Sequence, residues 1–281
     1  MIQEAEIKRL SASLQVDPQV VEHDYILGCF LYFLTQQELT QVSWIFKGGT
    51  CLAKCYFPGY RFSEDLDFTV IAKTNQKEVL TAVEQSSKRM HTALGIQTDL
   101  KGVSIDTIED DYGRESFEAK FYYRGPLQIP GSPRSVKVHI SADEELSFPS
   151  ITKTVLHPYS DKTDLPAATL RVYSLEEVFA EKLRALSGQR KYAIARDLFD
   201  LYHLAKAGSN VQAAIEVLPD KCRRKGIDPA VFALAAITAR KKDFQVNWTN
   251  NLEYLVPEGY KTNFEDAWLF ATGILARALP A

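Results

Sequence analysis

The pattern of hydrophobic and polar positions predicts a mixed first part of the chain and an almost wholly helical second part. Residues 16–36 have a broad apolar side, and Asp17 and Pro18 suit the N-cap and the first helical position. Residues 75–94 also repeat with a helical period, beginning at a capping residue, Asn75. We expect the first of these helices to pack against a sheet.

Short apolar or alternating segments predict strands in the rest of the first part. One apolar strand ends at Lys47 and another begins at Asp65, with a glycine turn and one or two helical turns between them. Gly and Pro residues just before residue 134 indicate a hairpin-like connection, and the acidic residues 109–111 are expected in a loop. Further strands are expected near residues 97–104, 116–124, 134–141, 151–156 and 169–173.

From Ser174 onward the pattern is helical. Ser174 and Glu177 have the spacing of a capping box, in which each side chain accepts a hydrogen bond from the backbone of the other residue. The first helix is expected to run to about Leu186 and to end at Gly188. A second helix is expected over residues 192–206.

Composition excludes few classes of protein. The 281 residues are 46% hydrophobic and 25% charged, as in ordinary globular proteins, and no apolar run is long enough to span a membrane. The N-terminal residues lack the features of a signal peptide, so a cytoplasmic location is expected. The four cysteines lack paired zinc spacing, and Cys51 and Cys55 are interpreted as small core residues.

Charge is distributed unevenly. The formal net charge is −3, yet residues 182–242 contain 13 Lys and Arg against five Asp and Glu. This region could therefore present a local basic surface to a polyanion, although solvated helix faces can have the same composition. If the protein binds RNA, residues 221–225 and 240–242 are the expected contacts with its phosphates.

The strongest chemical signal lies between residues 44 and 70. Gly48-Gly49-Thr50 stands where a strand ends and a helix begins, a position at which backbone N–H groups can bind phosphate. Asp65 and Asp67 would present paired carboxylates on one face of the next strand. Adjacent like charges are costly unless a cation neutralises them, and Mg²⁺ suits carboxylates and substrate phosphates. Taken alone, either motif could be only a turn or a solvated strand edge.

These residues together resemble the signature of the DNA polymerase β-like nucleotidyltransferase superfamily. The fuller string, Lys47-Gly-Gly-Thr-x-Leu followed by Arg61-x-Ser-x-Asp-x-Asp-Phe, resembles the AbiEii family of nucleotidyltransferase toxins from bacterial toxin–antitoxin and abortive-infection systems. The resemblance covers roughly residues 20–205. It implies that Mg²⁺ or Mn²⁺ is held by Asp65 and Asp67. It also implies contacts with a nucleoside triphosphate from a set of residues comprising Lys47, Gly48, Gly49, Thr50, Arg61, Ser63 and Lys182.

Residues 174–204 have two interpretations. Lys182 lies at the apolar edge of its helix, and Asp197 and Asp200 share a face of the next helix. An ion pair between the two helices would account for all three residues. The stretch also resembles the second half of the AbiEii signature, which implies that Lys182 contacts nucleotide phosphates and that Asp197 is an acidic partner in the site.

Other positions carry less specific signals. The resemblance to the nucleotidyltransferase superfamily implies a third carboxylate on a strand beside Asp65 and Asp67, but His139 occupies the corresponding position. Because imidazole is a poor Mg²⁺ ligand, either His139 acts as a base for the attacking hydroxyl or catalysis uses two carboxylates only. Asp143 could also substitute for the missing carboxylate, and a satisfied buried histidine is the remaining alternative. His23 and Asp24 resemble a Glu-x-Asp-Tyr-like string of family proteins, and a helix-surface pair is the alternative.

The expected fold is an α/β (α+β) nucleotidyltransferase core with a mixed sheet over residues 1–165. A helical C-terminal domain over residues 166–281 would contribute Lys182 and Asp197 to the site. The expected catalytic residues are Ser63, Asp65, Asp67, Lys182 and Asp197, with Asp24, His139 and Asp200 as further candidates. The resemblance implies a toxin with an antitoxin partner, which in this family is often a winged-helix regulator.

The expected reaction is transfer of a nucleoside monophosphate to an acceptor hydroxyl, and the family resemblance implies the tRNA 3′ end as a plausible acceptor. The alternatives are a nucleotidyltransferase acting on a small molecule or a protein, a phosphotransferase of the same fold, and a non-catalytic nucleotide- or partner-binding domain. A basic groove leading to Asp65 would count against a small-molecule acceptor. Pyrophosphate or nucleoside diphosphate as product would separate the two transfer reactions.

Overall fold

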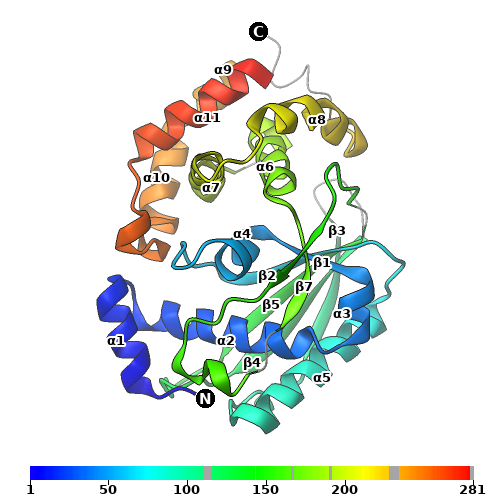
Figure 1. Ribbon diagram of the computed structural model, residues 1–281, viewed down its shortest axis with the longest axis vertical. Coiled ribbons are helices and arrows are strands. Elements are labelled where there is room, and N and C mark those ends of the chain that lie inside the picture. Colours follow the sequence, from blue (N-terminus) through cyan, green and yellow to red (C-terminus); the bar gives the residue numbers. More distant parts are fainter. Residues whose placement is uncertain (110–114, 143, 166–167, 190–191, 228–233, 279–281) are drawn as a thin grey trace. The chain divides into compact units, whose positions relative to one another are not determined.

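A mixed sheet organises the first of two compact units (Figure 1). The computed structural model describes residues 1–109, 115–142, 144–165, 168–189, 192–227 and 234–278. The first unit comprises Met1–Glu144, Ile151–Val172 and Pro257–Gly259, and the second comprises Glu145–Ser150, Tyr173–Val256 and Tyr260–Ala281. None of the described helices is long and apolar enough to cross a membrane.

The described strands of the first unit form one seven-stranded sheet in the order β3-β4-β5-β2-β1-β7-β6. Two neighbouring pairs, β1–β7 and β2–β5, are parallel, and the other pairs are antiparallel. The expected fold class, an α/β core with a mixed sheet followed by a helical part, is therefore confirmed. The strands are β1 (Trp44–Lys47), β2 (Asp65–Val70), β3 (Ser104–Glu109), β4 (Glu115–Tyr123), β5 (Arg134–Ser141), β6 (Ile151–Thr154) and β7 (Thr169–Val172).

Helices α2 (Pro18–Leu34) and α5 (Gln76–Leu94) start as the sequence predicts. Asp17 caps α2 through the backbone N–H of Gln19, and Asn75 forms a reciprocal capping box at the start of α5. The ring of Phe30 on α2 lies 4.4 Å from that of Phe121 on β4, so α2 covers the apolar face of the sheet. The remaining segments of this unit are α1 (Glu4–Leu14), α3 (Glu38–Ser43), α4 (Gly48–Cys51), the π-helix η1 (Leu52–Tyr56) and the 3-10 turn η2 (Ser160–Thr163).

Two expectations about strands need correction. The strand predicted over residues 97–104 is wrong, because only Gln97 makes an isolated bridge, to Arg124, and β3 begins at Ser104. Glu109 belongs to β3 and not to a loop, whereas residues 110 and 111 lie outside the described part of the chain. Strand β3 is an exposed edge strand, so its sequence has few apolar positions that could mark it.

The second unit is helical in its described residues. Helix α6 packs on α7 and α8, and α11 packs on the same two helices. The rings of Phe199, Trp248, Phe264 and Trp268 form part of the aromatic core of this unit. The segments are α6 (Leu175–Arg184), the π-helix η3 (Ala185–Gln189), α7 (Ala195–Lys206), α8 (Val211–Arg224), α9 (Leu234–Thr238), α10 (Lys241–Asn251), η5 (Glu253–Leu255) and α11 (Phe264–Ala278). A further 3-10 turn, η6 (Glu258–Tyr260), begins in the residues of the first unit and ends in the second.

The start of α6 differs from the prediction in one respect. Ser174 accepts a hydrogen bond from the backbone N–H of Glu177, as expected for an N-cap. The carboxylate of Glu177 does not complete a capping box but accepts bonds from the backbone of Ser147 and Phe148 and from the Lys221 ammonium. A buried lysine therefore redirects the Glu177 side chain, since an unpaired buried charge would be costly.

Candidate active site

The turn between β1 and α4 lies directly against the Asp67 carboxylate. In the β1–β2 ladder Lys47 is opposite Asp67, so Gly48 follows at the point where that side chain projects. Gly48 has φ +78°, and a Cβ added to it would lie 2.3 Å from Asp67 Oδ2. Glycine is therefore required here both for its backbone conformation and for the close approach of the carboxylate.

The next glycine makes room for two polar side chains. A Cβ on Gly49 would lie 2.6 Å from Arg61 Nη2 and 3.0 Å from Ser63 Oγ. Arg61 is almost fully buried, donates from Nη1 to the Phe62 carbonyl at 3.1 Å, and lies 5.9 Å from the centre of the Tyr60 ring. The structure thus brings a guanidinium and a hydroxyl directly over the backbone of the glycine turn.

Thr50 links the same turn to the start of β2. Its hydroxyl donates a 2.5 Å hydrogen bond to the backbone carbonyl of Asp65. The turn continues through the four residues of α4 into the π-helix η1, and π-helical turns are frequent at functional sites. The threonine therefore fixes the position of the first carboxylate residue relative to the glycines.

One face of the central strands is charged, while the opposite face is apolar. Asp65 pairs with Lys137 and Asp67 pairs with His139 across the parallel β2–β5 ladder. Glu118 on β4 is opposite His139 on the other side of β5. Because residues directly opposite in a sheet share a face, these side chains form a continuous polar row on the side away from the Phe30–Phe121 contact.

The surroundings of Asp65 disfavour its ionised form. Burial, followed by the charge of Asp67, raises the pKa of Asp65 above its usual value, while His139 and Lys137 act in the opposite direction. A carboxylate that is destabilised in this way gains from a bound cation. Among the described residues there is no cluster of three or more His, Cys, Asp and Glu side chains arranged to hold a metal ion.

The donor set nevertheless fits a magnesium ion. Mg²⁺ prefers oxygen ligands and commonly uses one or two protein carboxylates, completing its shell with water and substrate phosphates. Asp65 and Asp67 supply two such carboxylates beside the glycine turn, and a bound cation would favour the ionised form of Asp65, whose pKa is raised by burial and then by the Asp67 charge.

His139 lies on the strand beside the two aspartates, in the position where the sequence suggested a third carboxylate. Its Nε2 is 3.5 Å from Glu118 Oε2, and the Lys137 ammonium is also 3.5 Å from that oxygen. Glu118 was missed by sequence reasoning, although its alternation with apolar neighbours on β4 placed it on a polar face. Asp143, the other candidate, lies outside the described residues.

His23 and Asp24 lie in two separate buried networks. His23 Nε2 is 2.8 Å from the Glu64 carbonyl and Nδ1 is 2.8 Å from the Tyr123 hydroxyl, so Nε2 carries the proton and Nδ1 accepts. Burial lowers the pKa of His23 below its usual value. Asp24 accepts hydrogen bonds from Lys54 and Tyr159 instead.

In the second unit, one lysine links both acidic residues of α7. Lys182 Nζ lies 2.9 Å from Asp197 Oδ1 and 2.7 Å from Asp200 Oδ2. The side chains of Asp197 and Asp200 are almost fully buried, and that of Lys182 is 13% exposed. The ion pair between the two helices that the sequence suggested is present, with both aspartates as partners.

Part of the basic segment 221–225 at the end of α8 is buried and cannot contact RNA phosphates. Lys221 is fully buried and pairs with Glu177 at 2.6 Å, so the expectation that it contacts RNA phosphate is wrong. Burial is the main reason for the raised pKa of Glu177, and the Lys221 charge opposes it. Lys225 is also buried, whereas Arg223 and Arg224 keep exposed side chains.

Comparison with known proteins identifies a family and solved structures of similar fold. The family model for the nucleotidyl transferase AbiEii toxin of type IV toxin–antitoxin systems matches residues 32–268. MenT4, a nucleotidyltransferase toxin from Mycobacterium tuberculosis H37Rv, superposes with a TM-score of 0.57 at 19% identity, over 96% of this chain and 99% of its own. A candidate nucleotidyltransferase from H. pylori gives a TM-score of 0.55 at 18% identity, over 94% and 96% of the two chains. No curated protein matches the sequence.

Proposed function

Because the chain belongs to the AbiEii family of nucleotidyl transferase toxins of type IV toxin–antitoxin systems, we propose that it transfers a nucleoside monophosphate from a nucleoside triphosphate to an acceptor hydroxyl. The proposed acceptor is the 3′ end of a tRNA. The proposed partners are a cognate antitoxin of the winged-helix regulator type and the acceptor RNA.

One observation carries the proposal, namely the close packing of the Asp67 carboxylate on Gly48 beside Arg61 and Ser63 over Gly49. The turn offers backbone and cationic groups for phosphates, and the carboxylates offer metal ligands a short distance away. Such a juxtaposition suits a metal–triphosphate substrate, whose opposite charges must be bound side by side. The proposed nucleotide-binding set is Lys47, Gly48, Gly49, Thr50, Arg61, Ser63 and Lys182.

Asp65 and Asp67 are the proposed ligands for Mg²⁺ or Mn²⁺. When bound, the metal ion would neutralise phosphate charge and the charge that develops on the leaving group. The protein's own contribution is to hold the two carboxylates in place, through the Thr50–Asp65 hydrogen bond and the packing of Gly48 on Asp67. Arg61 would add a fixed positive charge that cannot be lost by deprotonation.

The reaction joins the acceptor oxygen to the α-phosphorus and breaks the bond between that phosphorus and the bridging oxygen of pyrophosphate. The acceptor proton must leave the hydroxyl as the new bond forms. His139 is the proposed base, because it lies on the strand beside the carboxylates and its Nε2 faces Glu118 Oε2 at 3.5 Å. The carboxylate of Glu118 would stabilise the imidazolium after proton transfer.

We propose that the region over residues 166–281 contributes Lys182 and Asp197 to the site of the core over residues 1–165. Lys182 would contact phosphate as a compact positive charge, a role for which lysine is suited. Asp197 and Asp200 orient the ammonium through their ion pairs with it. A lysine held by two carboxylates has a fixed position, which matters when the charge that it neutralises develops only during the reaction.

Product analysis tests the type of reaction. The protein is incubated with Mg²⁺, bacterial RNA and each of the four nucleoside triphosphates, and released pyrophosphate and nucleoside diphosphate are quantified. Pyrophosphate that depends on both RNA and one nucleotide supports nucleotidyl transfer to RNA. Nucleoside diphosphate as the product would instead establish transfer of the γ-phosphate. Retained nucleotide binding without either product would indicate a non-catalytic domain.

A further inference from the structure

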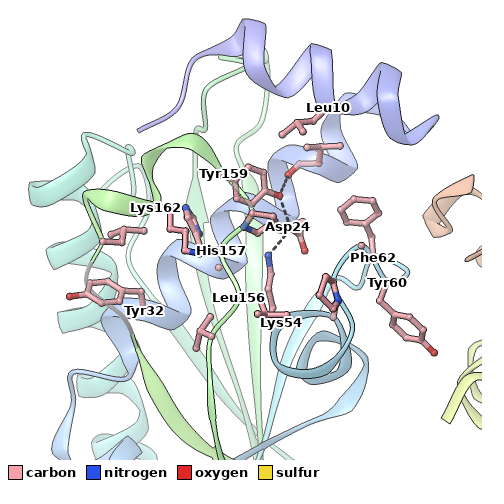
Figure 2. A pocket seen from close by; sticks show the side chains of 18 of the residues that line it. Leu10, Asp24, Tyr32, Lys54, Tyr60, Phe62, Leu156, His157, Tyr159 and Lys162 are labelled. Carbon is pink, nitrogen blue, oxygen red and sulfur yellow. Dashed lines mark hydrogen bonds and ion pairs between the residues drawn. The ribbon is translucent and has the colours of Figure 1, made fainter. Parts of the chain in front are cut away.

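A cavity of ligand size lies within the first unit, apart from the glycine turn (Figure 2). Its volume is about 560 Å³, within the range of typical small-molecule sites. It is lined by residues of α1, α2, η1 and the segment from Thr154 to Lys162. None of its described lining residues belongs to the glycine turn or to the Asp65–Asp67 pair.

The walls of this cavity are largely apolar and aromatic. Aliphatic side chains come from α1 and from the segment after β6, and aromatic rings come from α2 and from the loop before β2. These walls include Leu10, Leu14, Tyr32, Tyr60, Phe62 and Leu156. Such a surface suits a ligand with a hydrocarbon or aromatic body, because apolar atoms leaving water supply most of the binding free energy.

A charged cluster is set into the apolar wall. Lys54 donates to Asp24 Oδ2 at 2.6 Å, and the Tyr159 hydroxyl donates to the same oxygen at 2.6 Å. Figure 2 shows both bonds converging on Asp24. Burial, and then the charge of Asp24, raise the pKa of Tyr159 well above its usual value, so its hydroxyl remains a donor. Oδ2 of Asp24 thus accepts two hydrogen bonds.

The Lys54 ammonium has N–H donors that its ion pair with Asp24 does not use. An ammonium group carries three N–H donors, and the described residues show one hydrogen bond from Lys54, the bond to Asp24. The ammonium packs closely on the backbone of Gly28, since a Cβ there would lie 3.2 Å from Lys54 Nζ. The charged residues described in the lining are Asp24, Lys54 and Lys162, which gives a net positive charge.

We propose that this cavity binds small amphipathic monocarboxylates, with the apolar body against the aromatic walls and the carboxylate beside Lys54. A carboxylate has acceptors only, which matches the spare donors of Lys54 and the positive balance of the lining. The proposal concerns binding and goes beyond the proposed transfer reaction, on which it does not depend.

The position of the site relates it to the glycine turn. Ala53 and Lys54 line the cavity and belong to the π-helix η1. That helix follows directly from α4, which contains Gly48, Gly49 and Thr50. A ligand in the cavity would therefore lie against the helical segment that continues from the turn.

Binding is tested by titration calorimetry of the full chain with phenylbutyrate and with phenylbutanol, which share an apolar body and differ in the charged group. The blocking variant is Ala53→Phe, which puts a ring into the cavity from η1. A second blocking variant, Leu156→Trp, is used if the first does not fold. The matched control is Ala5→Phe on α1, where the added ring points to solvent and lies outside the lining.

The expected result is saturable binding of phenylbutyrate to the wild type and to Ala5→Phe, with phenylbutanol at least about tenfold weaker. A folded blocking variant should lose binding of phenylbutyrate. Equal binding of the acid and the alcohol would overturn the role given to Lys54. Unchanged binding by a folded blocking variant, or no binding of phenylbutyrate to the wild type, would overturn the site itself.

Discussion

Gly48 packs so closely on Asp67 that a Cβ at residue 48 would lie 2.3 Å from Oδ2 and 3.1 Å from the carboxyl carbon. The pairing of Lys47 with Asp67 in the β1–β2 ladder sets this distance. This contact links the glycine turn to the aspartate pair, because Gly48, the first residue of the turn, also limits where the carboxylate of Asp67, a proposed metal ligand, can lie.

Replacement of Gly48 by alanine should displace the Asp67 side chain as well as strain the backbone. We expect Gly48→Ala to lower nucleotidyl transfer by about a hundredfold, since a displacement of about an ångström in a catalytic group has an effect of that order. The matched control is Gly95→Ala, at φ +70° with open space around it, which has the same backbone strain. Equal activity of the two variants in a transfer assay would contradict this account.

The ionised Asp65 carboxylate is expected to destabilise the folded protein while being required for transfer. Because burial and Asp67 raise its pKa, the contribution of Asp65 to stability is most favourable at acidic pH and falls as pH rises from about 4 through the folded-state pKa. Asp65→Asn removes this penalty, and we expect it to raise the free energy of unfolding at pH 7 by roughly 0.5–2 kcal/mol without metal while abolishing transfer. Urea titration with chelator measures this, with Asp106→Asn on exposed β3 as the control. A less stable Asp65→Asn protein would argue against the predicted repulsion.

Lys182 should be important for stability as well as for any catalytic role. Lys182→Met leaves Asp197 and Asp200 without their shared ammonium, and breaking a buried ion pair of this kind costs about 3 kcal/mol. Lys8→Met removes an exposed pair of similar length, Lys8–Glu4 at 2.6 Å, and should cost less than about 1 kcal/mol. Chemical denaturation compares the two variants. A loss for Lys182→Met as small as that for Lys8→Met would show that the pair contributes little.

Acid should destabilise the network around His23. Its folded-state pKa lies below that of an unfolded histidine, about 6.5, so the native state resists protonation and stability is lost as pH falls from about 7 toward the folded-state pKa. A protonated ring could no longer accept from the Tyr123 hydroxyl. His23→Asn should therefore show a smaller loss of stability between pH 7.5 and 5 than the wild type. His91→Asn, at a more exposed histidine, should retain the wild-type pH dependence.

Much of the fold could be predicted from local chemistry. Asp17 and Asn75 cap helices because their side-chain oxygens reach free backbone N–H groups, and that ability depends only on nearby residues. The edge strand β3 was misplaced, because an exposed strand needs no apolar alternation to hold its position. The π-helical turns η1 and η3 were not predicted, since they have no sequence pattern distinct from that of an α-helix.

The site was predictable where the chain itself brings residues together. The spacing from Gly48 to Asp67 fits one strand–turn–helix–strand unit, so their proximity follows from local structure. Glu118 could not be placed, because its position beside His139 depends on the register of two further strand pairs. The burial of Lys221 could not be predicted either, because its partner Glu177 is 44 residues away in the sequence.

The most direct test of the central claim is incubation of the protein with each α-³²P-labelled nucleoside triphosphate, Mg²⁺ and total bacterial RNA, using wild type and Asp65→Ala. The account predicts label in a tRNA-sized band with the wild type and at least one nucleotide, and no label with Asp65→Ala. Equal labelling by Asp65→Ala would contradict the assignment of the site. Absence of label from RNA with every nucleotide would contradict the proposed acceptor.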